Sequence, residues 1–312
     1  MNLLRKKIIY FIMKSFITKL SIIILFILVF IKKDIMYYTI YSSTLLWFKN
    51  IVPNILPMFI ISSLIVSSNL IYDICNIFGG LFKKIFKVSI YGFYVFILSL
   101  VTGSPSNAKY ILDLKDNNLI SKSEQDKLLM FTLNYNPLLI VSLLSIYLSR
   151  RKSIMILLII ILSNIIVGIL NRNIKIDEIN NINKFNKINL SSIIKNTIDM
   201  LFMILGTIIF FNILINVIPI RNNLIKNILK GMLEITSGLK GIEYLDVSEN
   251  LKILLCIIYL SFGGLSIHTQ IKSILPDTNY KMFLKGRLFS LIISIILFIG
   301  FYKMGYLIHN MR

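Results

Sequence analysis

Cysteine and histidine are scarce in this sequence of 312 residues, and this scarcity argues against several classes of protein. The two cysteines, Cys75 and Cys256, lie in apolar surroundings without a CxxC or Cys/His cluster, which argues against a disulfide framework and a zinc site. The two histidines, His268 and His309, form no familiar metal motif together. Signatures of P-loop, Rossmann, hydrolase, kinase and metalloprotease folds are also missing, so we expect neither enzymatic activity nor a cofactor.

Charged residues are scarce as well. They make up 15% of the chain, whereas soluble domains carry roughly 25%. Hydrophobic residues make up 56%, and the mean hydropathy is +0.79. Several apolar runs approach or exceed the ~18 to 20 residues that a helix needs to cross the hydrocarbon core. Because a spanning segment must satisfy its own backbone, the sequence predicts an all-α, polytopic membrane protein.

Acidic residues number only 14 against 34 lysines and arginines, and these basic residues lie between the apolar runs. We interpret them as headgroup anchors, so the expected partner is the lipid bilayer and not nucleic acid. Basic residues occupy nearly every loop. The positive-inside rule therefore leaves the insertion direction open.

We expect a single integral membrane domain with about eight spanning or deeply buried helices. An anchor helix at residues 1–34 ends at Lys32 and Lys33 instead of at a cleavage site. A first repeat at 35–170 and a second at 196–312 flank a polar, Asn- and Lys-rich linker at 171–195. The expected helices lie near 10–31, 51–72, 90–102, 131–149, 153–170, 196–218, 251–268 and 287–308.

The two halves share a pattern, which predicts pseudo-repeats with broken or re-entrant segments. Each half carries a basic amphipathic stretch, at 75–90 and at 221–233, and each has an apolar helix that ends at a glycine-containing break. LSLVTGSPSNAK at 98–109 aligns with YLSFGGLSIHTQ at 259–270. In transporters, paired interrupted helices mark a binding site near the membrane midplane. Whether the repeats are parallel or inverted stays open.

The first break follows Thr102. Proline disfavours helical geometry in the residue before it, and a helix that restarts after the break points free N–H groups and a positive dipole end at a ligand, which suits an anion. Lys109 adds a full positive charge. In the alternative interpretation, the helix ends at the surface and Lys109 lies among the headgroups. The candidate binding residues of this break are Gly103, Ser104, Pro105, Ser106, Asn107 and Lys109.

A second polar interruption falls at Asn134, Asn136 and Pro137, within an apolar run. The asparagines are candidates either for binding a ligand or for packing helices together. The third interruption begins at a glycine pair, for which helix packing is the alternative. Its candidate lining residues are Gly263, Gly264, Ser266, His268 and Gln270.

Arg287 precedes the last apolar run and is a further candidate. Its guanidinium is suited to bidentate binding of a carboxylate. The alternative is that the side chain snorkels to the membrane interface.

The segment GSPSNAKYILDLKDNNLISKSEQDKLLMFTLNYNPLLI at 103–140 resembles the YlbJ/SpoVV sporulation integral membrane proteins of the nucleoside-recognition (gate) group. Their pattern is roughly SGYPxGAK followed by FxNxxPLFI. GMLEITSGL at 231–239 and SFGGLSIHTQ at 261–270 also resemble segments of this family, and the resemblance covers approximately residues 40–305. Ser104 and Asn107 depart from the usual tyrosine and glycine, which bears on the substrate more than on membership.

The resemblance implies a multipass protein of the outer forespore membrane that passes dipicolinic acid toward the developing spore. The substrate would then be a small organic anion, free or as a calcium complex, and other sporulation membrane proteins are possible partners. The alternatives are a non-transporting protein of forespore or cortex assembly, and a nucleoside or ion transporter. One feature separates transport from scaffolding, because transport requires the breaks at 102–109 and 261–270 to meet in a cavity.

Overall fold

Helices build the whole of the described structure. The computed structural model describes residues 19–20, 22–68, 70–177 and 189–310, and within these ranges it contains no strand. The expected all-α fold is therefore confirmed. The helices are α2 (Lys33–Leu46), a π-helical turn (Trp47–Ile51), α3 (Val52–Ser67), α4 (Leu70–Phe86), α5 (Tyr91–Thr102), α6 (Ser106–Asp116), α7 (Lys122–Leu129), α8 (Pro137–Leu144), α9 (Arg150–Leu170), α10 (Leu190–Val217), α11 (Asn223–Leu233), α12 (Ile235–Gly241), a 3-10 turn (Ile242–Tyr244), α13 (Glu249–Phe262), α14 (Gly264–Ile274) and α15 (Tyr280–Asn310).

Four described segments are long and apolar enough to cross a membrane: Arg150–Leu170, Leu190–Val217, Glu249–Ile274 and Tyr280–Tyr302. Two bent helix pairs raise this number to six if each pair is one span. The pair Leu70–Phe86 and Tyr91–Thr102 bends by 95°. The expected count of about eight is thus not confirmed. Most of the expected anchor helix at 1–34 lies outside the described residues. Within the described residues, the short apolar helix Ile22–Ile31 belongs to it.

Two boundaries differ from expectation for local reasons. The expected spanning helix at 131–149 is wrong, since residues 132–136 have no helical structure and α8 begins at Pro137 with Asn136 as its N-cap. Proline is favoured in the first turn of a helix because it has no N–H to satisfy. Helix α10 begins at Leu190, inside the expected linker, because the Asn189 side chain accepts a hydrogen bond from Ser192 N and caps it.

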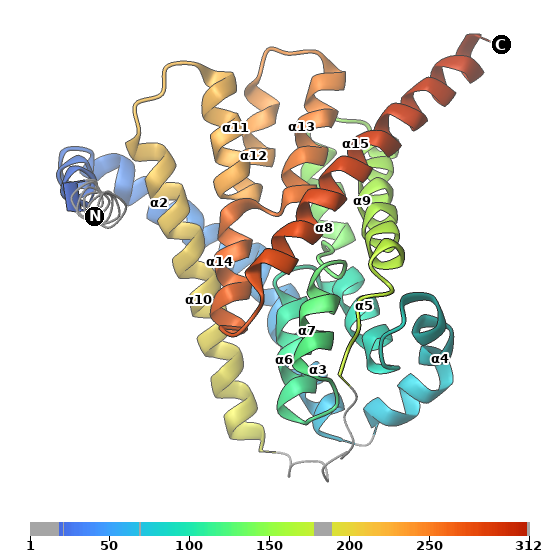
Figure 1. Ribbon diagram of the computed structural model, residues 1–312. Helices are drawn as coiled ribbons and strands as arrows, with labels where there is room; N and C mark the ends of the chain where they lie inside the picture. Colours follow the sequence, from blue (N-terminus) through green and yellow to red (C-terminus); the bar gives the residue numbers. More distant parts are fainter. Residues whose placement is uncertain (1–18, 21, 69, 178–188, 311–312) are drawn as a thin grey trace, which may run out of the picture.

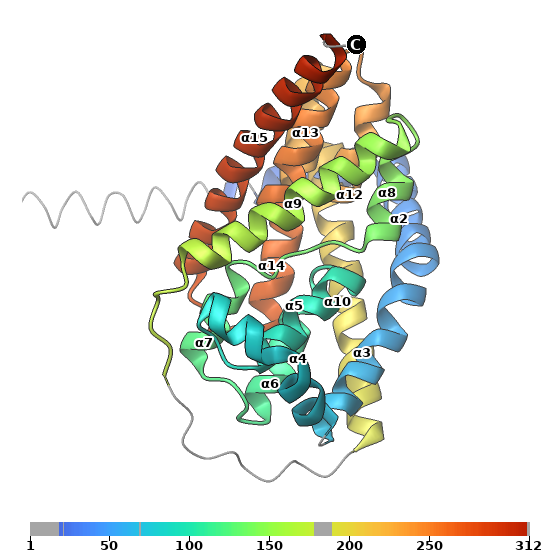
Figure 2. The ribbon, with the colours of Figure 1, turned by 90° about the vertical axis from the view of Figure 1, so that its right-hand side faces the viewer.

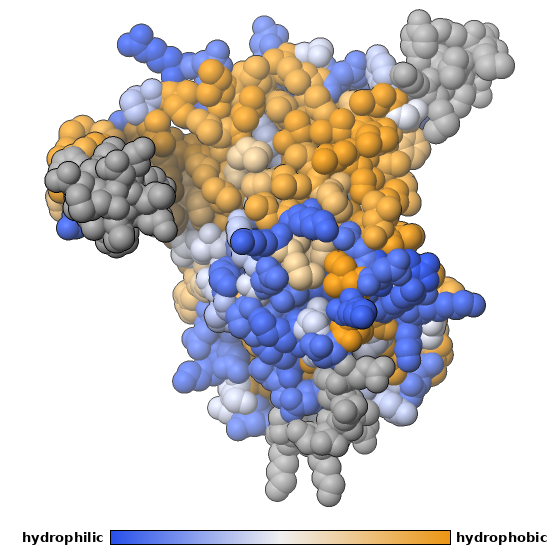
Figure 3. Space-filling model, in the orientation of Figure 1, coloured by the Kyte–Doolittle hydropathy of each residue, from blue (hydrophilic) through white to orange (hydrophobic). Residues whose placement is uncertain are grey.

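The surface is divided into an apolar and a polar part. Figure 3 shows hydrophobic residues gathered over the half that carries α11, α13 and most of α15, and hydrophilic residues over the half that carries α6 and α7 in Figure 1. Large exposed hydrophobic side chains occur on α9, α10 and α15, among them Leu158, Phe202 and Ile296. Such a surface is suited to lipid. Figure 2 shows α9 running obliquely across the bundle, with α4 to α7 gathered below it.

The amino-terminal helices pack along α10. Trp47 Nε1 donates to the Leu201 carbonyl at 2.9 Å, and Asn212 Nδ2 donates to Ser43 Oγ at 3.0 Å. Because hydrogen bonds from side chains join helices in lipid, these contacts fix α2 and the π-helical turn beside α10, and α3 packs against α10 next to them. The arrangement places α3 and α10 on two sides of the site described next.

Candidate functional site

The break between α5 and α6 is built on Gly103. This residue has φ +81°, a conformation that favours glycine, and a Cβ added to it would lie 2.6 Å from Asn136 N. Ser104 N donates to the Asn134 carbonyl at 2.8 Å. The break is therefore held against the non-helical segment 132–136. Helix α6 then starts after Pro105 with no side-chain cap.

The asparagines of segment 132–136 organise this region. Asn136 Oδ1 accepts from Leu139 N at 3.0 Å and so caps α8, while its Nδ2 donates to the Val101 carbonyl at 3.0 Å. Asn134 is fully buried, and its Nδ2 donates to Ser99 Oγ at 2.8 Å. Both side chains thus satisfy neighbouring helices, which is the packing role that the sequence left open beside ligand binding.

The second broken helix, α13 and α14, turns at Gly263 and Gly264, with φ +94° and +56°. Left-handed backbone at two successive positions explains why the sequence has a glycine pair here. Helix α14 also begins without a side-chain cap. A Cβ on Gly264 would lie 2.9 Å from Ile235 Cγ1, so the start of α14 contacts the start of α12 closely.

The basic amphipathic stretch at 221–233 forms α11, and α11 and the following α12 form a hairpin. They stand side by side in Figure 1. Gly231 and Gly238 bring the two helices close together, since a Cβ on Gly238 would lie 2.2 Å from Gly231 Cα. Glu234 forms the tip. Its Oε1 accepts from Thr236 N at 3.1 Å and its Oε2 from Ser237 N at 2.7 Å, which caps α12.

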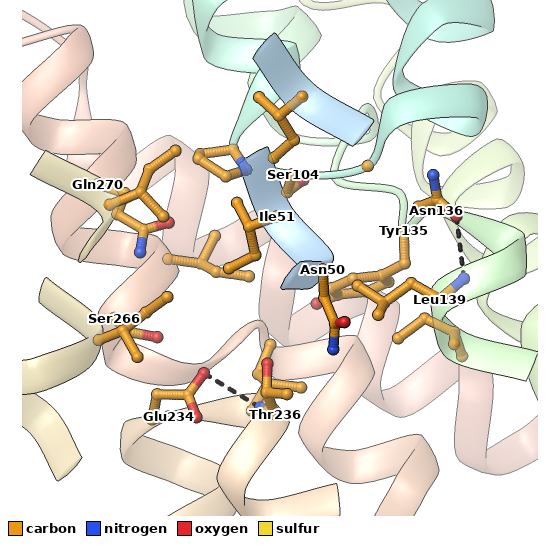
Figure 4. Close-up of a pocket in the computed structure, with 18 of the residues that line it drawn as sticks. Asn50, Ile51, Ser104, Tyr135, Asn136, Leu139, Glu234, Thr236, Ser266 and Gln270 are labelled. Carbon is orange, nitrogen blue, oxygen red and sulfur yellow. Dashed lines mark hydrogen bonds between the residues drawn. The ribbon is translucent and has the colours of Figure 1, made fainter. Parts of the chain in front are cut away.

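The two broken helices and the hairpin tip meet at a cavity of about 90 Å³. Helices α6, α8 and α12 begin at its wall, and α14 lines it from its third residue, Ser266, onward. Apolar residues of α3, α8 and α10 close the remainder. Figure 4 shows Ser104, Gln270, Ser266, Thr236 and Glu234 around this space. The lining residues are Asn50, Ile51, Ile55, Thr102, Gly103, Ser104, Pro105, Tyr135, Asn136, Leu139, Ile140, Leu143, Ile204, Ile208, Glu234, Ile235, Thr236, Leu239, Ser266, Ile267 and Gln270.

Six residues predicted from the sequence line this cavity: Gly103, Ser104, Pro105, Asn136, Ser266 and Gln270. The other eight do not: Ser106, Asn107, Lys109, Asn134, Gly263, Gly264, His268 and Arg287. Glu234 and Thr236 line it without having been proposed. In the sequence, the feature that could have marked them is the polar group Glu234, Thr236 and Ser237 directly after a basic amphipathic stretch. Their position next to α14 depends on how the hairpin folds, which the sequence does not reveal.

Lys109 faces away from this cavity. Its ammonium forms a buried ion pair with Asp113 and donates to Ser63 Oγ at 2.8 Å. Burial raises the pKa of the Asp113 carboxyl, while the nearby Lys109 charge opposes this shift. The pair lies at a second, polar cavity of about 210 Å³ between α3, α6 and α10. Helix α6 therefore has one end at each cavity.

Arg287 lies fully buried on α15, so it does not snorkel to the interface. Its Nη2 donates to the Met130 carbonyl at 2.6 Å and to Asn164 Oδ1 at 3.3 Å. Nε and Nη1 have no hydrogen-bond partner among the described residues, and none of the ion pairs there includes Arg287. An ionisable side chain buried in a spanning segment is by default a candidate functional position.

His268 has both ring nitrogens engaged. Nδ1 lies 2.9 Å from Tyr280 Oη, and Nε2 lies 2.9 Å from the Phe262 carbonyl, to which it donates. The ring stacks on Phe262 with a centroid separation of 4.7 Å. His268 therefore has a structural role, because its ring joins α14 to Tyr280 at the start of α15 and to the end of α13.

Comparison with known proteins places the chain in a family. No family model and no solved structure matches it. It is 25% identical over 292 residues to the sporulation integral membrane protein YlbJ of Bacillus subtilis (strain 168), covering 78% of this chain and 72% of that protein. The chain belongs to the YlbJ family. This YlbJ-family chain is thus a sporulation integral membrane protein, in agreement with its apolar helices.

Proposed function

We propose that this YlbJ-family protein transports a small organic anion, dipicolinate, across the outer forespore membrane toward the developing spore. The observation that carries the proposal is the cavity itself. Thr102 to Pro105 from the first half and Ser266 and Gln270 from the second half share one wall. A scaffolding protein does not require two broken helices to converge at one cavity, whereas a transporter binds its substrate at such a place.

Two features of the structure add positive potential near the cavity. Helices α6 and α14 have 11 residues each and begin without side-chain caps. The N-cap of α6, Pro105, lines the cavity, as does Ser266 in the first turn of α14, so their positive dipole ends lie at or near it. Arg287 Nη2 donates to Asn164 Oδ1, and Asn164 Nδ2 donates in turn to the Leu133 carbonyl and to Asn134 Oδ1. The guanidinium therefore lies behind segment 132–136, of which Tyr135 and Asn136 line the cavity. Because its charge has no carboxylate partner among the described residues, it adds positive potential where dipicolinate would bind.

The cavity also has the character that a flat aromatic acid requires. Isoleucine and leucine side chains supply most of its wall, and Ser104, Asn136, Ser266 and Gln270 supply hydrogen-bonding groups. Small-molecule sites combine an apolar lining with a few polar groups in this way. The volume of about 90 Å³ is small, so we expect the two halves to move apart when the substrate enters.

The test is the dipicolinate content of spores and mother cells in a deletion strain complemented with variants. Gln270→Leu removes a lining amide, and Thr269→Val changes its exposed neighbour, which does not line the cavity. We expect the deletion strain and Gln270→Leu to make dipicolinate without delivering it, and Thr269→Val to deliver it normally. Normal delivery in the deletion strain would reject transport and leave an assembly role.

A further inference from the structure

A carboxylate lies in the cavity that we assign to an anion. Among the described residues of the lining, Glu234 is the one with a formally charged side chain. It is 4% exposed and belongs to the tip of the α11–α12 hairpin. Figure 4 shows its side chain at the cavity, joined to Thr236. An anion that enters this space meets a negative charge of the protein.

The other buried carboxylates of the described chain lie elsewhere. Glu124 accepts from Ser89 N at 2.6 Å, Asp126 accepts from Asn279 N at 2.9 Å, and Asp113 pairs with Lys109. None of these three lines the cavity. Glu234 thus combines burial, a capping role and contact with the substrate space, whereas Glu124 is buried and accepts one backbone N–H without lining the cavity.

Proton binding would resolve the repulsion. Like charges in a shared site favour the neutral form of one of them, so an anion in the cavity favours protonated Glu234. Linkage is reciprocal, and therefore a proton on Glu234 increases the affinity of the cavity for the anion by the same factor. The proton comes from water and forms an O–H bond with one carboxyl oxygen.

Protonation would also act on the hairpin. At present each carboxylate oxygen accepts one backbone N–H, from Thr236 and from Ser237. A carboxyl group that carries a proton has a weaker acceptor on that oxygen, so the cap of α12 is reduced. Ser237 keeps a second anchor, since its Oγ donates to Asn212 Oδ1 at 2.7 Å on α10. The tip is therefore a place where a proton changes both charge and geometry.

We infer that Glu234 takes up one proton when the anion occupies the cavity, and that this YlbJ-family protein couples anion transport to proton movement in the same direction. The inference rests on the proposed function.

Neighbouring charged and titratable groups set the balance at Glu234. On α11, the basic residue Lys230 lies one helical turn before Glu234, and the Lys230 carbonyl accepts a hydrogen bond from Glu234 N at 2.7 Å. The hydroxyls of Tyr135 and Tyr259 are directed elsewhere, to the Leu260 carbonyl at 2.7 Å and to Asn227 Oδ1 at 2.8 Å. The remaining titratable groups on α12 and on the elements packed against it are Lys240 on α12, Lys226 on α11, Glu249, Lys252 and Cys256 on α13, and Glu243 and Tyr244 in the turn after α12.

The experiment uses the full chain in proteoliposomes with radiolabelled dipicolinate as the probe. We expect a proton gradient directed inward to raise uptake by the wild type at least about 10-fold, and a dipicolinate gradient to acidify the lumen. For Glu234→Gln we expect loss of both coupled effects: a proton gradient no longer changes its dipicolinate uptake, and a dipicolinate gradient no longer acidifies the lumen. Glu124→Gln is the matched control and is expected to behave like the wild type.

Each outcome is decisive. Gradient-driven accumulation by Glu234→Gln equal to that of the wild type would overturn the inference. If Glu234→Gln does not insert, the wild-type ratio of protons to dipicolinate decides, because a ratio of zero overturns the inference and a ratio near one supports it. A wild-type protein without any dipicolinate counterflow would overturn the proposed function and the inference together. Counterflow without proton coupling would overturn the inference alone, so the two failures are distinguishable.

Discussion

Lys115 on α6 forms an ion pair with Asp277 in the turn between α14 and α15, so a cation of the first half holds a carboxylate of the second. Lys122 Nζ lies 3.4 Å from the same carboxylate, and Gln125 Nε2 lies 3.3 Å from its other oxygen. These contacts join α6 and α7 to the turn that follows the broken helix α14. The hydrogen bond from Lys115 is the main reason why the pKa of Asp277 is lowered from 3.8 to about 2.

The Asp277 contact should make stability depend on pH in acid. A carboxyl whose pKa is lower in the folded state contributes stability above its ordinary value of 3.8, and this contribution is lost as the pH falls through about 2. Asp277→Asn removes it. We expect the variant to melt about 2 °C or less below the wild type at pH 7, because the side chain is partly exposed. Thermal unfolding in detergent should show this difference shrinking between pH 4 and pH 2.

Glu249→Gln provides the control for Asp277→Asn. Glu249 pairs with Lys152 at 2.6 Å with both side chains nearly half exposed, and this pair joins α9 to α13, whereas Asp277 joins α6 and α7 to the turn after α14. We expect little change in melting at either pH. A difference between Asp277→Asn and the wild type that stays constant down to pH 2 would contradict the assignment.

Gly103 should not tolerate a side chain. Gly103→Ala places a Cβ 2.6 Å from Asn136 N on backbone with φ +81°. The positive φ alone costs about 1 to 3 kcal/mol, and the close approach adds to it. We expect a much reduced yield of folded protein, measured by monodispersity in detergent. Gly206→Ala on α10 is the control, since a Cβ there has nothing within 4 Å, and it should fold normally. Normal yield of Gly103→Ala would contradict the rigid break.

The sequence could predict where the two helices of the site are interrupted. A glycine with positive φ and a proline leave a local signature, so Gly103, Pro105 and Gly263 marked the interruptions correctly. Their meeting in a cavity depends on tertiary packing. Glu234 was not selected for the same reason, because nothing local shows that the hairpin tip contacts α14.

Lys109 illustrates the opposite case. A lysine after a break suggests an anion site, but Asp113 follows at the i+4 spacing that brings opposite charges together on one helical face. The helix at 131–149 was wrong because hydropathy alone favoured it, whereas Asn136 and Pro137 together form a helix start. Local capping rules would have distinguished a helix that starts at Pro137 from a continuous helix at 131–149, whereas average hydropathy did not.

The Lys109–Asp113 pair should show strong energetic coupling. Removing one partner of a buried pair leaves the other charge uncompensated, so Asp113→Asn is expected to destabilise the protein by about 3 kcal/mol. The double variant Lys109→Met/Asp113→Asn removes both charges and should be less unstable than the sum of the single variants, with a coupling energy of about 1 to 3 kcal/mol. Denaturant unfolding measures all three. If the changes in unfolding free energy of the single variants add up to that of the double variant, the interaction between Lys109 and Asp113 contributes no stability.

Arg287 should separate transport from stability. A buried charge without a counter-charge is costly, and apolar replacements of buried ionic groups are often neutral or stabilising. Arg287→Met loses the bonds to Met130 and Asn164 but also removes the buried guanidinium, so we expect its unfolding free energy to stay within about 1 kcal/mol of the wild type. Its dipicolinate counterflow should fall at least about 10-fold, since the cavity loses positive potential. Arg287→Lys keeps the charge and should retain more activity than Arg287→Met. Equal counterflow by Arg287→Met and the wild type would show that the guanidinium does not act on the anion, and the helix termini of α6 and α14 would then have to attract it alone.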